Sequence, residues 1–130
     1  MHERRSYERF EVDGKVTLKD ESGQSIISEA SLNDFSFKGF GFYCQDAFKK
    51  DVVISFDIFV QPFSETLSGK GRIRHTANPI GFASKVFNSG VEFIDVNSDH
   101  VTHILKRIQA KIINELRNNR QSEPLNFLPY

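Results

Sequence analysis

Two short segments carry side chains that suit the binding of a nucleotide. Arg5 and Arg9 lie four residues apart near the start of the chain, and each guanidinium has a planar set of donors that fits phosphate oxygens or the O6/N7 edge of guanine. Further along, Asp34 supplies a carboxylate that accepts both N–H groups of guanine's Watson–Crick edge, Ser36 supplies a hydroxyl, and Gly39 permits close approach of the backbone. The two segments together predict a nucleotide-binding site rather than a catalytic one.

The length and charge of the chain limit the class of protein. A chain of 130 residues has the usual size of one domain. Its 17 basic and 17 acidic residues cancel, which argues against binding to a nucleic-acid polymer, because that depends on a broad basic surface. No apolar run resembles a signal peptide or approaches the roughly 20 residues of a membrane-spanning helix. The lone Cys44 fits a reducing compartment, so we expect a soluble cytoplasmic protein.

The elements that must position the polar residues are mostly β-strands, because apolar side chains recur on every second residue. The alternating segments are 10–18, 26–32, 40–44, 52–60, 67–74 and 82–94. We predict that the last of them forms a closing hairpin around a turn at Asn88-Ser89-Gly90. Six or seven short antiparallel strands favour a small closed β-barrel, since closure removes exposed strand edges.

A C-terminal α-helix follows the predicted strands, with Ser98 or Asp99 as its N-cap. Its apolar residues recur at helical spacing and are expected to pack on the sheet: Val101, Ile104, Leu105, Ile108, Ile112 and Leu116. We therefore divide the chain into a flexible arm over residues 1–9, a barrel with its terminal helix over 10–119, and an irregular tail over 120–130. The tail contains two prolines, and the arm is charged and short of apolar anchors.

The two polar segments match the RxxxR and DxSxxG motifs of a known family. With Arg5 and Arg9 in the first motif and Asp34, Ser36 and Gly39 in the second, the sequence resembles the PilZ domain, a bacterial receptor for cyclic di-GMP. In that family the first motif lies on a flexible segment before the first strand, and the second lies at the start of a strand of the barrel. The resemblance extends from residue 4 to about residue 116, and both motifs in this order on a β-rich background are fairly specific.

The resemblance implies a role for each matching residue. Arg5 and Arg9 are expected to hold guanine edges and phosphates, and Asp34, Ser36 and Gly39 are expected to complete the site.

Two further arginines carry finer expectations. An arginine at the place of Arg4 is associated in this family with two intercalated ligand molecules rather than one, so we expect a ligand dimer. Arg74 lies roughly where family members often have an aromatic residue or an arginine that stacks on guanine, although a solvated strand face explains Arg74 nearly as well.

The function that the resemblance implies is that of a receptor or adaptor rather than an enzyme. Binding of cyclic di-GMP would order the arm on the barrel and create a surface for a protein partner in trans. The sequence does not indicate the partner, the oligomeric state or the process controlled, such as motility, secretion or polysaccharide synthesis. The apolar residues of the tail would either dock a partner or fold back on the barrel.

The same residues also have plainer interpretations. Arginines near a terminus are usually solvated charges, and a pattern like that of Asp34 to Gly39 is most often a turn at a strand entrance. The main alternative function is therefore a PilZ-like protein-interaction module that binds no nucleotide. A phosphodiesterase acting on the same nucleotide would need clustered metal-binding carboxylates and histidines, which the sequence does not show.

Three other patterns in the sequence have a possible chemical role. His100 and His103 lie three residues apart on the predicted helix and, with Asp99, suggest a metal site that lacks a further ligand. The segment Gly39-Phe40-Gly41 lacks the third glycine of a dinucleotide-binding fingerprint. Cys44 is expected to be a small core residue. We therefore predict no catalytic residue, no metal and no cofactor apart from the ligand.

Overall fold

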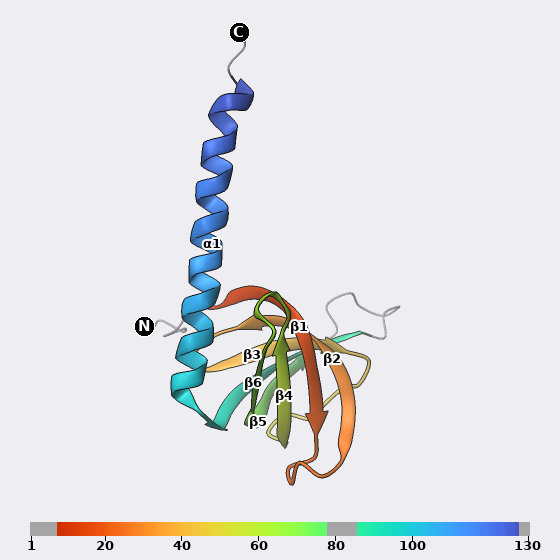
Figure 1. Ribbon diagram of the computed structural model, residues 1–130. Helices are drawn as coiled ribbons and strands as arrows, with labels where there is room; N and C mark the ends of the chain where they lie inside the picture. Colours follow the sequence, from red (N-terminus) through yellow and green to blue (C-terminus); the bar gives the residue numbers. More distant parts are fainter. Residues whose placement is uncertain (1–7, 78–85, 128–130) are drawn as a thin grey trace, which may run out of the picture.

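The computed structural model describes residues 8–77 and 86–127, which form a closed antiparallel barrel with one long helix (Figure 1). The elements are β1 (Phe10–Lys19), β2 (Ile26–Phe35), β3 (Gly39–Cys44), β4 (Val53–Val60), the 3-10 helix η1 (Gln61–Phe63), β5 (Glu65–Ala77), β6 (Phe87–Val96) and α1 (Ser98–Phe127). Around the barrel the strands follow the order β1-β2-β3-β6-β5-β4, and β4 pairs with β1 to close it. The predicted mainly β fold with a C-terminal helix is confirmed.

The core contains the apolar residues that alternate along the strands. In β4, Ile54, Phe56, Ile58 and Val60 are fully or almost fully buried, while the residues between them face outward. Phenylalanine rings from different strands meet at the centre, and the rings of Phe40 and Phe56 lie edge to face with centroids 4.9 Å apart. Cys44 belongs to the same core, as predicted.

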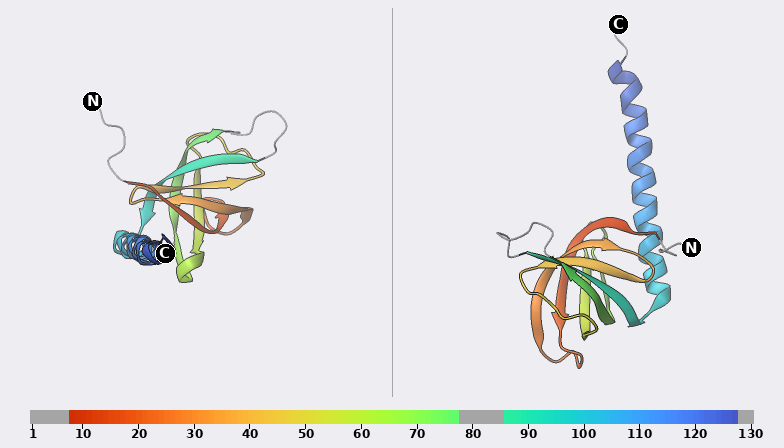
Figure 2. Two further views of the ribbon diagram at one scale, coloured as in Figure 1. Left: turned by 90° about the horizontal axis from the view of Figure 1, so that it is seen from above. Right: turned by 180° about the vertical axis from the view of Figure 1, so that it is seen from behind.

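Helix α1 passes over the end of the barrel where β1, β3 and β5 begin and β2, β4 and β6 end (Figures 1 and 2). Val101, Ile104 and Ile108 are buried in the barrel core, as the helical spacing predicts. Ile112 and Leu116 are not, because the helix continues beyond the edge of the barrel (Figure 1). The prediction that the whole stripe packs on the sheet is therefore wrong for its second part.

The helix also runs further than predicted. It ends at Phe127, so residues 120–127 are helical rather than irregular. The segment has no glycine, and Pro124 alone removes only one backbone donor from the helix. Residues 128–130 lie outside the described residues. None of the helices over 8–77 and 86–127 is long and apolar enough to cross a membrane, and α1 is rich in charged side chains.

Two local predictions near the end of the barrel are corrected. Asn88-Ser89-Gly90 forms no turn but lies inside β6, where Gly90 pairs with Gly41 on one side and with His75 on the other. Strand pairing on both edges satisfies the backbone here and overrides the local turn preference of these residue types. The N-cap of α1 is Asn97 rather than Ser98 or Asp99, because Asn97 Oδ1 accepts the backbone N–H of His100 at 3.0 Å.

Candidate functional site

The turn between β2 and β3 is built by Ser36. Its backbone N–H donates to the carbonyl of Gly39 at 2.8 Å, and its hydroxyl oxygen accepts the backbone N–H groups of Lys38 and Gly39, each at 3.2 Å. The hydroxyl also lies 3.3 Å from the carbonyl oxygen of Gly39, to which it donates. Ser36 is buried, so its side chain shapes the turn from within.

Gly39 allows β3 to approach β6. A Cβ at this position would lie 1.9 Å from the carbonyl oxygen of Val91, so no other residue fits without moving the backbone. The turn is also bonded to β6, because the backbone N–H of Phe93 donates to the carbonyl of Lys38 at 2.8 Å. Ser36 and Gly39 therefore hold the turn in a fixed position beside the end of β2.

Asp34 and Arg9 meet at this end of the barrel. Arg9 directly precedes β1, which pairs with β2, and its Nη1 lies 3.4 Å from Oδ1 of Asp34. The other carboxylate oxygen of Asp34 accepts the side-chain amide of Asn33 at 3.3 Å. The structure thus brings together one residue from each polar segment. Arg4 and Arg5 lie outside the described residues.

Two paired glycines lie buried beneath the side chains of Asp34 and His75. Gly41 of β3 and Gly90 of β6 are paired directly, and both face the outside of the barrel, because their neighbours in each strand point into the core. A Cβ at Gly41 would lie 3.0 Å from Oδ1 of Asp34, and a Cβ at Gly90 would lie 2.3 Å from Nε2 of His75. The side chains of Asp34 and His75 therefore lean over the two glycines from opposite sides. We call these four residues the glycine platform.

His75 rather than Arg74 belongs to this platform. The register between β5 and β6 shifts between Ile73 and His75, and Arg74 is the residue without a pairing partner. Arg74 forms ion pairs, with Nη1 3.5 Å from Asp51 and Nε 3.7 Å from Glu92. Sequence reasoning missed His75 because strict alternation places it on the inner face, and only the irregularity at Arg74 turns it outward.

A surface groove near the glycine platform carries acidic side chains, unlike the basic segment that ends at Arg9. A groove of about 460 Å³ beside Asp34 is lined by Glu11, Asp13, Asn33 and Tyr43, together with Val12 and Leu32. Its two carboxylates repel phosphate, so this groove does not suit the charged part of a nucleotide. The cations that would accept phosphate come from the segment ending at Arg9.

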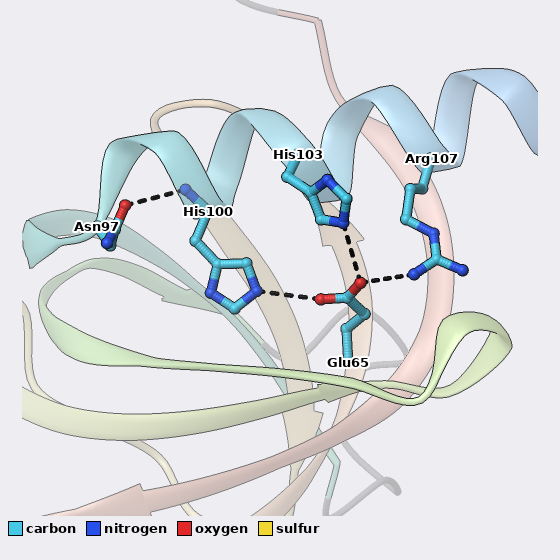
Figure 3. Close-up of polar contacts among 5 residues, drawn as sticks. All are labelled: Glu65, Asn97, His100, His103 and Arg107. Atoms are coloured by element: carbon cyan, nitrogen blue, oxygen red, sulfur yellow. Dashed lines mark hydrogen bonds and ion pairs between the residues drawn. The ribbon is translucent and has the colours of Figure 1, made fainter.

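His100 and His103 of α1 both bind one carboxylate, that of Glu65, and do not form a metal site. Glu65 accepts hydrogen bonds from Nε2 of His100 and of His103, each at 3.1 Å, and from Nη1 of Arg107 at 2.6 Å (Figure 3). These donors, with His100 foremost, lower the pKa of Glu65 to about 2. Arg107 also lies over the ring of Phe63, 4.9 Å from its centroid. We call Glu65, His100, His103 and Arg107 the Glu65 cluster.

The Glu65 cluster fastens α1 to the start of β5. A guanidinium on the shared carboxylate opposes the binding of a metal cation at the same oxygens. No group of three or more His, Cys, Asp or Glu residues within the described ranges is arranged to hold a metal ion. Sequence spacing pointed to His100 and His103, but their common partner, Glu65, lies far away in the chain.

Comparisons with known proteins bear on the fold. Models of protein families match residues 3–111 to the PilZ domain. Among solved structures, the Bacillus subtilis inhibitor of motility (MotI/DgrA) is similar with a TM-score of 0.70 and 15% identity, over 87% of this chain and 53% of that chain. Escherichia coli YcgR in complex with c-di-GMP has a TM-score of 0.68 and 15% identity, over 91% of this chain and 50% of that chain.

The PilZ domain of YcgR with c-di-GMP, taken alone, has a TM-score of 0.65 and 14% identity, over 92% of this chain and 99% of that domain. The chain thus spans about half the length of the two longer proteins. No curated protein matches the sequence. At these identities the likeness concerns the fold.

Proposed function

The chain belongs to the PilZ domain family, and from that premise we propose that it is a receptor for cyclic di-GMP. The observation that carries the proposal is the meeting of the two motifs, with Arg9 Nη1 3.4 Å from Asp34 Oδ1. The fold supports it, because the similar PilZ domain of YcgR was solved with c-di-GMP. The ligand would lie on the outer face of the barrel, between the arginine segment and the glycine platform.

Asp34 would change partners when the ligand binds. Its carboxylate is 20% exposed and the Arg9 side chain is 40% exposed, so their ion pair, with atoms 3.4 Å apart, lies at the surface in partial contact with water. Such pairs contribute only about 0–1 kcal/mol, so replacing this one costs little. Asp34 would then accept the N–H groups of a guanine, and Arg9, with Arg5 from the same motif, would bind the phosphates or guanine edges.

The glycine platform would receive a guanine ring. The two glycines are buried beneath Asp34 and His75, so the exposed His75 ring that lies over Gly90 would offer the aromatic face for stacking. Arg74 was the residue expected to stack, but its ion pairs with Asp51 and Glu92 favour His75 for this role. Ser36 and Gly39 would act by holding the turn that positions Asp34.

The remaining parts of the proposal concern the arm and the outcome of binding. We propose that Arg4 supports a second, intercalated ligand molecule, that the part of the arm before Arg9 becomes ordered on the barrel when ligand binds, and that the receptor acts on a protein partner in the cytoplasm rather than by catalysis. We also propose that the chain is organised as an arm, a barrel with its helix, and a C-terminal segment, with the helix extending to Phe127.

Calorimetric titration with cyclic di-GMP tests the proposal. We expect saturable binding, two ligands per chain, and recovery of unhydrolysed nucleotide afterwards by chromatography. Arg9→Ala and Asp34→Ala should each lower affinity roughly ten- to a hundredfold, because each removes a charged hydrogen-bonding group worth about 1.5–3 kcal/mol. Arg117→Ala, on the exposed part of α1, is the matched control and should bind like the wild type. Unchanged affinity in both site variants would favour the alternative, an interaction module that binds no nucleotide.

A further inference from the structure

Helix α1 has a second apolar face that the barrel does not cover. The face towards the core consists of Val101, Ile104 and Ile108. A second row, Gln109, Ile112, Ile113 and Leu116, has the spacing i, i+3, i+4, i+7 of a single helix face. The exposed fractions of Ile112, Ile113 and Leu116 are 37%, 48% and 55%.

The start of β1 forms one wall of this face. Glu8 and Phe10 line a shallow groove of about 280 Å³ together with Gln109, Ile112 and Ile113. The figures agree that the first residues of β1 pass beside the part of α1 that lies nearer its N-terminal end (Figures 1 and 2). Phe10 directly follows Arg9, so one wall of the groove is continuous with the proposed nucleotide site.

Two cations border the opposite edge of the face. Lys106 and Arg117 lie in the same helical row as Ile113, and their eleven-residue separation spans three turns, about 16 Å. Both side chains are exposed, and neither forms an ion pair with any other residue that the structure describes. In contrast, Arg107 is bound by Glu65 and Lys111 by Glu115. These two cations give this edge of the apolar face a positive charge, while Glu8 lies on the opposite wall of the groove.

The Glu65 cluster keeps this face in a fixed position. Its three donors come from successive turns at the start of α1 and share one carboxylate on the barrel (Figure 3). The cluster therefore fixes the orientation of α1, and with it the position of the groove and the two cations, before a partner binds. A preformed surface binds with a smaller entropic cost than one that must be ordered.

We propose that the face formed by Phe10, Ile112, Ile113 and Leu116, bordered by Lys106 and Arg117, binds an amphipathic helix of a partner protein that has an apolar stripe and two acidic residues about three turns apart. This deepens the partner-binding part of the proposed function and rests on it. An apolar helix face laid into a groove between helix and strand is an established mode of recognition.

A second copy of the chain fits this face less well than an acidic helix. The exposed apolar row covers only two turns, whereas stable interfaces bury about 1,200–2,000 Å². In an antiparallel pair of copies Lys106 of one would approach Arg117 of the other, and in a parallel pair each would approach itself. Like charges repel in both arrangements.

Fluorescence anisotropy with two synthetic helical peptides of about 18 residues tests the proposal on the full chain. The first peptide has a leucine stripe bordered by two glutamates eleven residues apart, and the second has lysines in place of the glutamates. We expect the wild type to bind the acidic peptide at least about tenfold more tightly. Leu116→Glu should weaken that binding about tenfold or more by placing a charge in the apolar row. Asn114→Glu adds the same charge to an exposed position on another face and should leave it unchanged.

Charge reversal gives the sharpest outcome. The double variant Lys106→Glu/Arg117→Glu should lose its preference for the acidic peptide and bind the basic one instead. Equal binding of both peptides, no effect of Leu116→Glu, or a wild-type dimer in sedimentation that Leu116→Glu abolishes would each overturn the proposal. Titrating the same variants with cyclic di-GMP keeps the two questions apart, since docking can fail while nucleotide affinity stays at the wild-type value.

Discussion

The His75 imidazole lies over Gly90, so close that a Cβ at residue 90 would come within 2.3 Å of its Nε2. The same relationship is repeated on the neighbouring strand, where Asp34 leans over Gly41. Two polar side chains from β2 and β5 thus cover the paired glycines of β3 and β6, both of which are buried. Neither glycine belongs to the DxSxxG motif, yet each allows a polar side chain from a neighbouring strand to lie close against the barrel.

His75 is expected to contribute to nucleotide affinity through its aromatic ring. His75→Ala should weaken cyclic di-GMP binding by roughly 1–3 kcal/mol, the usual contribution of an aromatic side chain stacked on a base. His75→Phe, which keeps a flat ring and removes the nitrogens, should retain most of the affinity. Calorimetry on both variants measures the effect.

Arg74→Ala is the matched control for His75, because it removes a neighbouring exposed cation that is held in ion pairs. It should change affinity by less than about threefold, in line with the small contribution of surface ion pairs. If Arg74→Ala lowered nucleotide affinity more than His75→Ala did, Arg74 rather than His75 would be the residue that stacks on the base.

The two glycines on β3 should respond differently to the same substitution. At Gly39 an added Cβ meets the backbone oxygen of Val91 at 1.9 Å, so Gly39→Ala should destabilise the fold by about 1–3 kcal/mol or more through forced backbone movement. At Gly41 the nearest atoms belong to the Asp34 side chain at 3.0 Å, which can rotate. Gly41→Ala should therefore keep most of the stability and lose nucleotide affinity. Urea denaturation and calorimetry separate the two effects, and a Gly41→Ala protein with wild-type affinity would contradict the prediction.

The two faces of α1 should differ in their contribution to stability. Ile104 is fully buried against the barrel, and Ile104→Ala should cost about 2–5 kcal/mol of unfolding free energy. Ile113 is 48% exposed on the second face, and Ile113→Ala should change that free energy by no more than about 0.5 kcal/mol. Equal losses in urea denaturation would show that the second face is covered within the folded chain.

The features that the sequence predicted correctly have a local signal. Alternation along 54–60 reports burial on one face of a strand, because the side-chain period of a strand is two residues, whereas Val52 lies before β4 and is exposed. The spacing of Val101, Ile104 and Ile108 reports a helix face in the same way, and all three residues are buried. The RxxxR and DxSxxG motifs assigned Arg9 and Asp34 to one site, and the structure places the two side chains 3.4 Å apart before any ligand is bound.

The features that it missed depend on contacts between distant segments. Asn88-Ser89-Gly90 has the composition of a turn, but pairing with β3 and β5 keeps it extended. The register shift at Arg74 turns His75 outward, and no residue type in the sequence predicts such a shift. Glu65 gave no sequence signal either, because its three partners lie on α1.

The Glu65 cluster should make stability depend on pH in the acid range. The folded-state pKa of Glu65, about 2, lies below its ordinary value of 4.5, so the carboxylate stabilises the fold fully above about pH 4.5. This stabilisation is lost as the pH falls from 4.5 towards 2, because the unfolded chain then binds a proton that the folded chain does not. Asp20 and Asp57 also have lowered pKa values and add to the same loss, so the comparison must be made with a variant.

Glu65→Gln isolates this contribution. At pH 7 the variant should lose roughly 1.5–3 kcal/mol, the usual contribution of hydrogen bonds to a charged group. The difference between wild type and Glu65→Gln should shrink between pH 4.5 and 2, whereas Glu115→Gln, which removes an exposed carboxylate paired with Lys111, should follow the wild type throughout. Urea denaturation at a series of pH values gives these free energies. A difference that stays constant down to pH 2 would mean that the charge of Glu65 does not hold α1 to the barrel, and that the packing of Val101, Ile104 and Ile108 holds it alone.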